Sequence, residues 1–450
     1  MSISGITGGA RAVLGLVACL AIAMVGCSAE GDTGSSSGGR NAARDGNDFG
    51  NATPADQGNS PTGDQDFGNT DTSGGGDRPI LNPEAGRTGG GEVDFSYIWI
   101  ANTLEGTVSK LDTRTLTELG RYYTSPTGTG LPSRTTVAED GDVAVANRGG
   151  ASNAPGGDGG GITKIYAKQE KCEDKNGNGM IDTSTGATDI RPWGEDECVA
   201  WHTPLNYFSN RPVAWAPPSA PDAPADVWTA AAAPPNGALC GPLDCTIDVI
   251  RLNGLTGAIK DMVSIPGLTG TDFIGGGLAG GFPIPFAGVI IENYGPYGGA
   301  SDSGGNFWTF VSNTTQLIRV DAVDLSVRIW QIEPLGNGYG FTIDEKGRVF
   351  VCGSLGISRF SPADETWATS SGGPILGMNG CMTDGAGKIW VGGGSDFGDV
   401  GLHGFDAETL AHVASFAVGA VKGVSIDVDG FVWGVGSAGA FGAGATSANT

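Results

Sequence analysis

A strand signature recurs along this chain at a nearly constant spacing. It reads GRVFVCG at 347–353, GKIWVGG at 387–393 and GFVWGVG at 430–436, and each copy follows an acidic turn. Its turn glycines lie 42, 40 and 43 residues apart along Gly305, Gly347, Gly387 and Gly430. A period of about 40–45 residues with one aromatic strand per unit is typical of β-propeller blades. The sequence therefore predicts an all-β propeller of four-stranded antiparallel blades.

The centres of this strand indicate how many blades there are. The markers are Trp99, Ala144, Trp228, Trp308, Phe350, Trp390 and Trp433. Two intervals are about twice as long as the others, and their surplus is unusual in composition, so we interpret it as insertions rather than extra blades. The first unit begins at the marker strand and the last unit ends soon after it. We expect a seven-bladed propeller, with a six-bladed ring and a surplus strand as the alternative.

Each unit also carries a second pattern after its marker strand. Segments such as 108–120, 318–330 and 403–416 contain an apolar strand, a turn that begins with Asp, and another alternating strand, which together predict a hairpin. An Asp in such a turn accepts backbone N–H bonds. We expect the marker aromatics to fill the space between blades.

The charge balance excludes one class of partner. The chain has 49 acidic and 25 basic residues, for a net charge of −24. A surface this acidic repels phosphate backbones, so we expect no binding to nucleic acid.

The N-terminus has the pattern of an export signal. Arg11 precedes an apolar run at 12–26 that is too short for a spanning helix and fits a secretory signal. The closing MVGC at 24–27 resembles a bacterial lipobox, and this resemblance implies that Cys27 is lipidated. Ser28 in the next position implies sorting to the outer membrane. We expect an exported chain, anchored by lipid to the bacterial outer membrane or cell surface.

The composition divides the chain into three segments. Residues 1–27 are the signal segment, and 28–92 are a Gly/Ser/Asp-rich tether with too few large apolar residues to fold. Residues 93–450 form the propeller, with a Cys-bracketed insertion at 168–210 and a Gly-rich insertion at 267–288.

The sharpest local motif is CEDKNGNGMID at 172–182. Oxygen-bearing side chains alternate along it and converge when the chain coils tightly, which suits Ca²⁺. The motif is similar to the calcium loops of thrombospondin type 3 and dockerin modules. The expected ligands are Asp174, Asn176, Asn178, Asp182 and the backbone oxygen of Met180. An Asn/Gly turn without an ion is the alternative.

The cysteines fit an exported, oxidising setting. Cys172 and Cys198 bracket the calcium motif, so a bridge between them would close that loop. Proximity in the sequence also suggests a pair within CGPLDC and a pair between neighbouring blades. These further pairs are Cys240 with Cys245 and Cys352 with Cys381.

The repeats resemble YVTN/NHL-type bacterial propellers, and the whole pattern is similar to the virginiamycin B lyase-like group. That group carries a histidine at the start of the innermost strand. The matching stretches here, LPSRTT at 131–136 and AVKGVS at 420–425 among them, have none. We therefore expect a binding or scaffolding protein, with a metal-assisted lyase or hydrolase as the alternative. Tyr294 and Tyr297 are candidates for contact with a protein or carbohydrate ligand.

Overall fold

The computed structural model describes the chain from residue 95 to residue 436, with gaps. The described residues are 95–149, 160–205, 207, 210–220, 223–233, 246–265, 295–312, 316–332, 338–353, 356–374, 376–377, 379–394 and 399–436. They all belong to the second of two compact units, residues 77–450. The signal segment, the tether, the Gly-rich insertion, Cys240, Cys245 and Tyr294 lie outside the described residues. Within the described part, no helix is long and apolar enough to cross a membrane.

The described residues form antiparallel sheets in chain order. The first is β1 (Tyr97–Asn102), β2 (Thr107–Asp112) and β3 (Thr117–Tyr123). The second is β4 (Pro132–Val137), β5 (Val143–Asn147), β6 (Gly161–Ile165) and β7 (Val199–Pro204), with the short 3₁₀ helix η1 (Gln169–Lys171) after β6. The third is β8 (Val213–Trp215), β9 (Asp226–Ala233), β10 (Thr246–Asn253) and β11 (Ile259–Ile265).

The remaining sheets follow the same plan. The fourth is β12 (Gly295–Ser301), β13 (Phe307–Ser312), β14 (Gln316–Val320) and β15 (Val327–Gln331). The fifth is β16 (Gly340–Ile343), β17 (Val349–Gly353), β18 (Gly356–Ser361) and β19 (Thr366–Thr369). The sixth is β20 (Cys381–Thr383), β21 (Lys388–Gly393), β22 (Gly401–Asp406) and β23 (His412–Phe416), and β24 (Gly423–Ile426) pairs with β25 (Val432–Val435).

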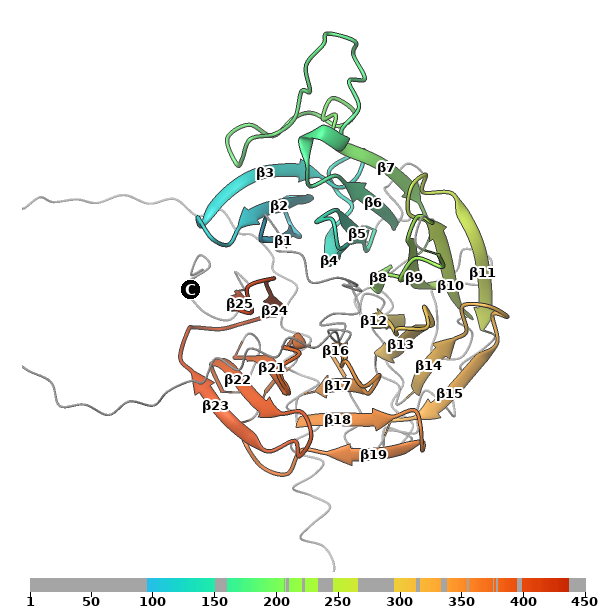
Figure 1. Ribbon diagram of the computed structural model, residues 1–450, viewed down its shortest axis with the longest axis vertical. Helices are drawn as coiled ribbons and strands as arrows, with labels where there is room; N and C mark the ends of the chain where they lie inside the picture. Colours follow the sequence, from blue (N-terminus) through green and yellow to red (C-terminus); the bar gives the residue numbers. More distant parts are fainter. Residues whose placement is uncertain are drawn as a thin grey trace, which may run out of the picture. The chain divides into compact units, whose positions relative to one another are not determined.

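The sheets are arranged as a β-propeller (Figure 1). Each sheet is a meander whose first strand lies innermost, and the innermost strands contact one another in chain order from β1 to β24. Among the described residues, six sheets have the three or four strands of a blade, whereas β24 and β25 form a two-stranded sheet. The prediction of seven blades is therefore wrong and its six-bladed alternative is correct. The surplus is two strands rather than one, because β25 pairs with β24.

One ion pair joins the last sheet to the first blade. Arg114, in the turn between β2 and β3, donates from Nε to Asp429 Oδ2 at 2.7 Å and from Nη2 to Oδ1 at 2.9 Å. Asp429 lies in the turn between β24 and β25. The pair is bidentate, and it brings together turns that are 315 residues apart in the sequence.

Six of the seven marker residues lie in the second strand of their sheet, whereas Trp99 lies in β1, the first strand of the first sheet. The marker aromatics are structural. Trp228 is fully buried between blades three and four, where its ring stacks on Phe307 with centroids 5.8 Å apart. The aspartates of the turns bind the indole groups of several other marker tryptophans by hydrogen bonds. In each of three sheets, one oxygen of the turn Asp accepts backbone N–H bonds while the other accepts the indole N–H. These pairs are Asp302 with Trp308, Asp384 with Trp390 and Asp427 with Trp433.

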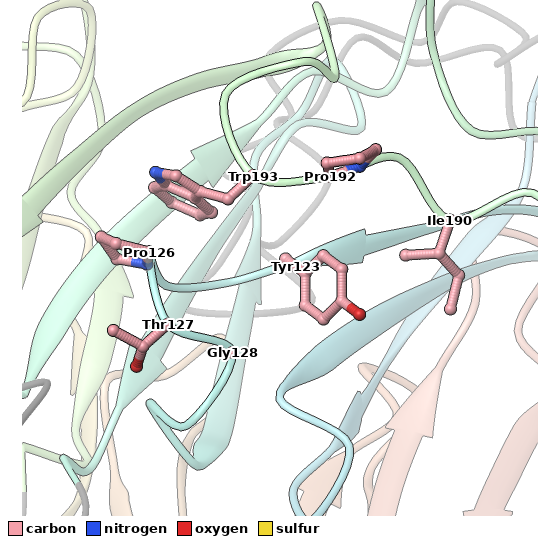
Figure 2. Close-up of a pocket in the computed structure, with 7 residues that line it drawn as sticks. All are labelled: Tyr123, Pro126, Thr127, Gly128, Ile190, Pro192 and Trp193. Carbon is pink, nitrogen blue, oxygen red and sulfur yellow. The ribbon is translucent and has the colours of Figure 1, made fainter.

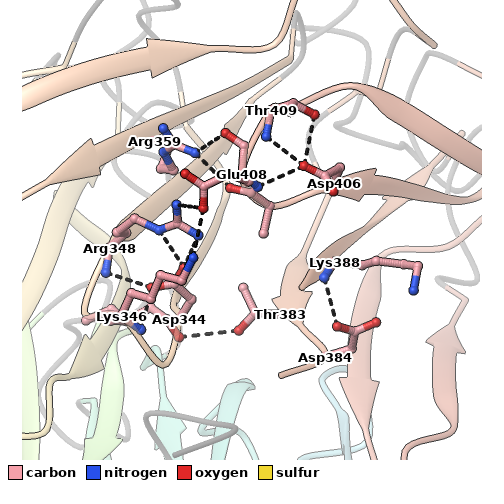
Figure 3. Close-up of polar contacts among 12 residues, drawn as sticks. Asp344, Lys346, Arg348, Arg359, Thr383, Asp384, Lys388, Asp406, Glu408 and Thr409 are labelled. Atoms are coloured by element: carbon pink, nitrogen blue, oxygen red, sulfur yellow. Dashed lines mark hydrogen bonds and ion pairs between the residues drawn. The ribbon is translucent and has the colours of Figure 1, made fainter. Parts of the chain in front are cut away.

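A basic residue at one position of β2, β6, β10, β14 and β18 ties most of these blades to the next blade. It is the third residue in VSKLD, ITKIY, VIRLN, LIRVD and ISRFS. The head group crosses to the backbone oxygen at the start of the next blade's outer turn, and Figure 3 shows Arg359 in this position. Four such bonds are made: Lys110 to Ala167 at 2.8 Å, Lys164 to Gly254 at 3.2 Å, Arg251 to Ala322 at 2.8 Å and Arg359 to Ala407 at 2.9 Å. Arg319 instead bonds Asp321.

Two predicted disulfides are confirmed. Cys172 and Cys198 close the loop between β6 and β7, with their Cα atoms 4.7 Å apart. Cys352 of β17 and Cys381 of β20 join blades five and six, with Cα atoms 6.5 Å apart. A bridge that closes a loop of this length contributes about 3–4 kcal/mol in the loop-entropy model.

Candidate functional site

Five side chains meet where the innermost strands begin. Those strands lie innermost in the ring, so residues near their starts gather at one end of the ring axis, which we call the channel mouth (Figure 1). Three of the side chains are basic and two are phenolic. They are Arg134 in β4, Arg211 just before β8, Tyr297 in β12, Tyr339 just before β16 and Lys422 just before β24.

The cations lie against the two phenol rings. The rings of Tyr297 and Tyr339 are neighbours, with centroids 4.7 Å apart. The guanidinium of Arg134 lies 5.4 Å from the first ring and 5.2 Å from the second. Arg211 lies 4.4 Å from the Tyr297 ring, and Lys422 lies 4.2 Å from the Tyr339 ring. Cations over aromatic faces are attracted by about 0.5–2 kcal/mol each, so the rings hold the cations in place.

Hydrogen bonds fix the same group. Arg134 Nη2 donates to the backbone oxygen of Tyr339 at 2.9 Å, a contact between blades two and five. Arg211 Nη1 donates to Tyr297 Oη at 3.1 Å and to Ser133 Oγ at 3.3 Å. Because the first contact joins non-adjacent blades, it crosses the centre of the ring.

Burial divides the group into two levels. Arg211 and Tyr297 are 4% and 6% exposed, whereas Arg134, Tyr339 and Lys422 are half-buried. Burial raises the pKa of Tyr297 to about 12, so this phenol stays neutral and accepts the Arg211 bond at any physiological pH. Tyr297 was expected to face a ligand directly. Its burial indicates that it supports Arg211 instead.

The sequence analysis did not single out Arg134, Arg211 or Lys422. Two of them stand in LPSRTT and AVKGVS, the stretches that were compared with the histidine motif of the lyase-like group. Their shared position at the start of an innermost strand was the available signal. A chain with only 25 basic residues places three of them here.

The predicted calcium motif lies between β6 and β7 and forms a loop of Asx turns. Asp174 Oδ1 accepts from Gly177 N at 2.7 Å, and its Oδ2 accepts from Gly179 N at 2.8 Å. The amides of Asn176 and Asn178 both donate to Asp182 Oδ2, at 2.8 and 2.7 Å. These two bonds lower the pKa of Asp182, and they show that three of the four predicted side-chain ligands converge.

The acids that follow the motif support its backbone. Glu197 accepts from Lys175 N at 2.8 Å and from Asp182 N at 2.7 Å, so one carboxylate joins the two ends of the motif. Asp196 accepts from Ser184 N at 2.9 Å and Cys198 N at 3.0 Å. Met180 is exposed. Among the described residues, no three His, Cys, Asp or Glu side chains form a metal-like group.

The histidines lie on the outer strands, away from the channel. His202 of β7 bonds Thr163, and its ring meets the edge of Trp193. His403 Nε2 donates to the backbone oxygen of Asp399 at 3.0 Å, and its Nδ1 lies 2.8 Å from Ser415 Oγ. His412 also bonds Ser415.

A shallow hollow of about 350 Å³ lies on the outer side of blades one and two (Figure 2). Tyr123 and the neighbouring 126–128 form one wall, and Ile190, Pro192 and Trp193 of the Cys-bracketed loop form the other. Its lining lacks charged groups, unlike the channel mouth.

Solved structures similar to this chain include other β-propellers. Streptogramin B lyase matches with a TM-score of 0.47 and 12% identity, over 79% of this chain and 91% of that one. BamB from Moraxella catarrhalis matches with a TM-score of 0.39 and 12% identity, over 76% and 78%. The extracellular domain of a putative one-component system from B. thetaiotaomicron matches at 0.41 and 12%, over 76% and 40%.

Neither of the other comparisons yields a relative. No protein-family model matches the chain. No curated protein matches it either. At identities this low, structural likeness bears on the fold alone.

Proposed function

We propose that this chain is a lipid-anchored, calcium-stabilised propeller of the bacterial envelope that binds a ligand at the mouth of its channel. The observation that carries the binding role is the convergence of Arg134, Arg211 and Lys422 on two adjoining tyrosines. A lyase or hydrolase of the metal-assisted kind needs acidic or histidine side chains there. The described side chains at this mouth are cationic and phenolic, which favours binding.

The binding role is tested by cross-linking in intact envelopes. A photo-cross-linking amino acid at Ser133, beside Arg211, should give one discrete product. The same amino acid at Val323, which is 90% exposed in an outer turn, should not. Equal labelling from both positions, or none from Ser133, would contradict a ligand at the channel mouth.

The anchor is proposed from the lipobox-like MVGC at 24–27. Replacing Cys27 by Ala should leave the chain unprocessed or release it from membranes, because the thiol that carries the lipid is gone. Fractionation and mass spectrometry of the mature N-terminus are the measurements. A wild-type chain that is wholly soluble and carries an unmodified terminus would contradict the anchor.

Calcium is proposed to bind Asp174, Asn176, Asn178 and Asp182, with the Met180 backbone oxygen as a further ligand. The convergence of both amides on Asp182 supports this placement, since the same side chains would surround an ion. The Cys172–Cys198 bridge and Glu197 hold the loop in shape before any ion arrives.

A further inference from the structure

We propose that the β24–β25 sheet is a docking site for a β-hairpin of another polypeptide, which pairs with β25 on the side away from β24 and extends the sheet to four strands. The expected first strand of the hairpin has a basic residue followed directly by an apolar one. This surface is separate from the channel mouth, so the inference goes beyond the proposed ligand-binding role and does not depend on it.

The first argument is the open edge of β25. Among the described residues, β25 pairs with β24 alone, whereas the second strand of every four-stranded sheet has a neighbour on both sides. An unpaired edge presents a row of backbone N–H and C=O groups that can bond an added strand. The residues of β25 are mostly half-buried, whereas those of β5 and β17 are all buried. The edge therefore offers both hydrogen bonds and incompletely covered side chains to an incoming strand.

The second argument is an aromatic pair on blade six that lacks a cover. In blade four, the rings of Trp308 and Trp330 stack with centroids 5.4 Å apart. Phe360, in the third strand of the next blade, covers both rings at centroid distances of 6.2 and 5.1 Å. The matching pair of blade six is Trp390 with Phe416, with centroids 5.9 Å apart.

The two pairs differ in exposure. Trp308 is 2% exposed, whereas Trp390 is half-buried and Phe416 is 53% exposed. Gly434 of β25 lies against Leu402, which is the cross-strand neighbour of Phe416. A strand added beyond β25 would therefore lie over Phe416 and supply the apolar residue that Phe360 supplies in blade five.

The third argument is the residue that pairs with each marker. In five sheets, the strand after the marker strand places a basic residue directly opposite the marker. These pairs are Trp99 with Lys110, Ala144 with Lys164, Trp228 with Arg251, Trp308 with Arg319 and Phe350 with Arg359. In the β24–β25 sheet the marker is Trp433, and no described strand lies on that side of it. A docked strand would place its own Lys or Arg opposite Trp433.

Blade one has the matching acceptor for that basic residue. Each basic side chain that bonds the next blade reaches the backbone oxygen three residues after that blade's own residue at the same position. The acceptors are Ala167, Gly254, Ala322 and Ala407. Thr113 stands three residues after Lys110 in blade one. The basic residue of the docked strand would donate to the Thr113 oxygen, so the hairpin would continue the contacts that already join the blades.

The apolar residue of the expected strand follows from the same alignment. Phe360 directly follows Arg359, and the residue after the basic one is apolar in the other blades as well. The required order, basic then apolar, therefore provides both the contact with Thr113 and the cover over Phe416.

The test adds a synthetic hairpin to the full mature protein. The probe is a peptide with the sequence of residues 316–332, because β14 and β15 are the third and fourth strands of a blade and contain Arg319 followed by Val320. The peptide should bind in isothermal titration and slow hydrogen exchange of the β25 amides, while exchange in β17 stays unchanged. A control peptide with Asp in place of both Arg319 and Val320 should bind at least about tenfold more weakly.

Variants of the protein locate the site. Phe416→Asp should weaken binding of the 316–332 peptide at least about tenfold, because a charge replaces the apolar contact. Ile259→Asp is the control, since Ile259 is also 53% exposed and lies on β11, the outer strand of blade three. If Phe416→Asp fails to fold, Phe416→Ala should show the same direction of change. A peptide that does not bind, or equal loss in Ile259→Asp, would overturn the inference.

Two further outcomes would assign the edge to a different occupant and overturn the proposal. Exchange of the β25 amides that is as slow as in β21 before any peptide is added would mean that the edge is already filled. Self-association of the protein that Phe416→Asp abolishes would mean that a second copy occupies the site.

Discussion

Glu408 shows how one exposed carboxylate contributes to stability. It lies at the outer turn of blade six and accepts bonds from Lys346 at 2.9 Å and from Arg348 at 2.7 Å, both on blade five (Figure 3). These bonds lower its pKa from 4.5 to about 2. A depressed pKa means that the ion pairs stabilise the fold above about pH 4.5 and are lost as the pH falls toward 2.

We expect Glu408→Gln to change the acid limb of the stability profile. Wild type should be more stable than the variant at pH 6, and the difference should shrink between pH 4.5 and pH 2. Urea midpoints across this range are the measurement. Glu345→Gln, at a half-buried residue next to Lys346 in the sequence, is the control, and a constant difference at every pH would contradict the assignment.

The calcium motif gives a second prediction at this scale. Calcium should raise the melting temperature of the wild type, because only the folded loop assembles the ligands. Asp174→Ala should remove that increment and leave the far-ultraviolet spectrum intact. Asp364→Ala, in an exposed turn of blade five, is the matched control. A wild type with no calcium-dependent shift would mean that the loop is an Asn/Gly turn alone.

At the scale of the element, the outer turns repeat one strained position. Four non-glycine residues there have φ between 57° and 61°, in the left-handed region that disfavours a Cβ atom. The equivalent residue in blade three is Gly257, with φ of 74°. The four are Leu116, Leu325, Glu365 and Leu410.

Leu116 and Leu410 separate the effect of backbone strain on stability from the effect of side-chain burial. Both have φ of 58°, but Leu116 is 57% exposed and Leu410 is 1% exposed. Leu116→Asn should raise the free energy of unfolding by up to about 1 kcal/mol, because Asn tolerates this backbone conformation. Leu410→Asn should lower it by about 2–4 kcal/mol, because the buried side chain is lost. Chemical denaturation measures both, and a destabilised Leu116→Asn would contradict the strain argument.

The strands could be predicted from the sequence where the pattern that specifies them spans only a few residues. Trp308 and Trp390 sit in the expected strands because the D-x-x-G turn and the alternation that follows it are short-range patterns. The blade-to-blade cations carried a local signal too, at one position of β2, β6, β10, β14 and β18, which the sequence analysis did not use. Register between distant strands left no such trace. The pair between Arg114 and Asp429, 315 residues apart, therefore needed the structure.

The channel mouth depends on the whole molecule. Arg134 and Tyr339 are 205 residues apart, and they meet because the ring brings the starts of innermost strands together. No spacing in the sequence encodes that distance. Of the two predicted ligand residues, Tyr297 lies in this cluster, and the cations come from three other sheets.

The Arg114–Asp429 pair leads us to a prediction about how the ring is closed. Both side chains are partly exposed, at 41% and 33%, so the pair contributes little to global stability, about 0–1 kcal/mol. It links the two-stranded sheet to the first blade, however, so Arg114→Met should speed hydrogen exchange in β24 and β25 selectively. Arg328→Met, which breaks an exposed pair with Glu365, is the control. Unchanged protection of β24 and β25 would contradict a closing role.

The basic side chains that bond the next blade all point the same way around the ring. Each bond runs from one blade to the backbone of the blade after it. The series omits blade four, where Arg319 bonds Asp321, and it ends before blade six, where Gly404 occupies the position of the basic residue. Tension applied along the chain would therefore meet cross-links at most blade boundaries and none of this kind at the last one. The boundary between blade six and the β24–β25 sheet is therefore weaker, and under mechanical force β24 and β25 would detach first.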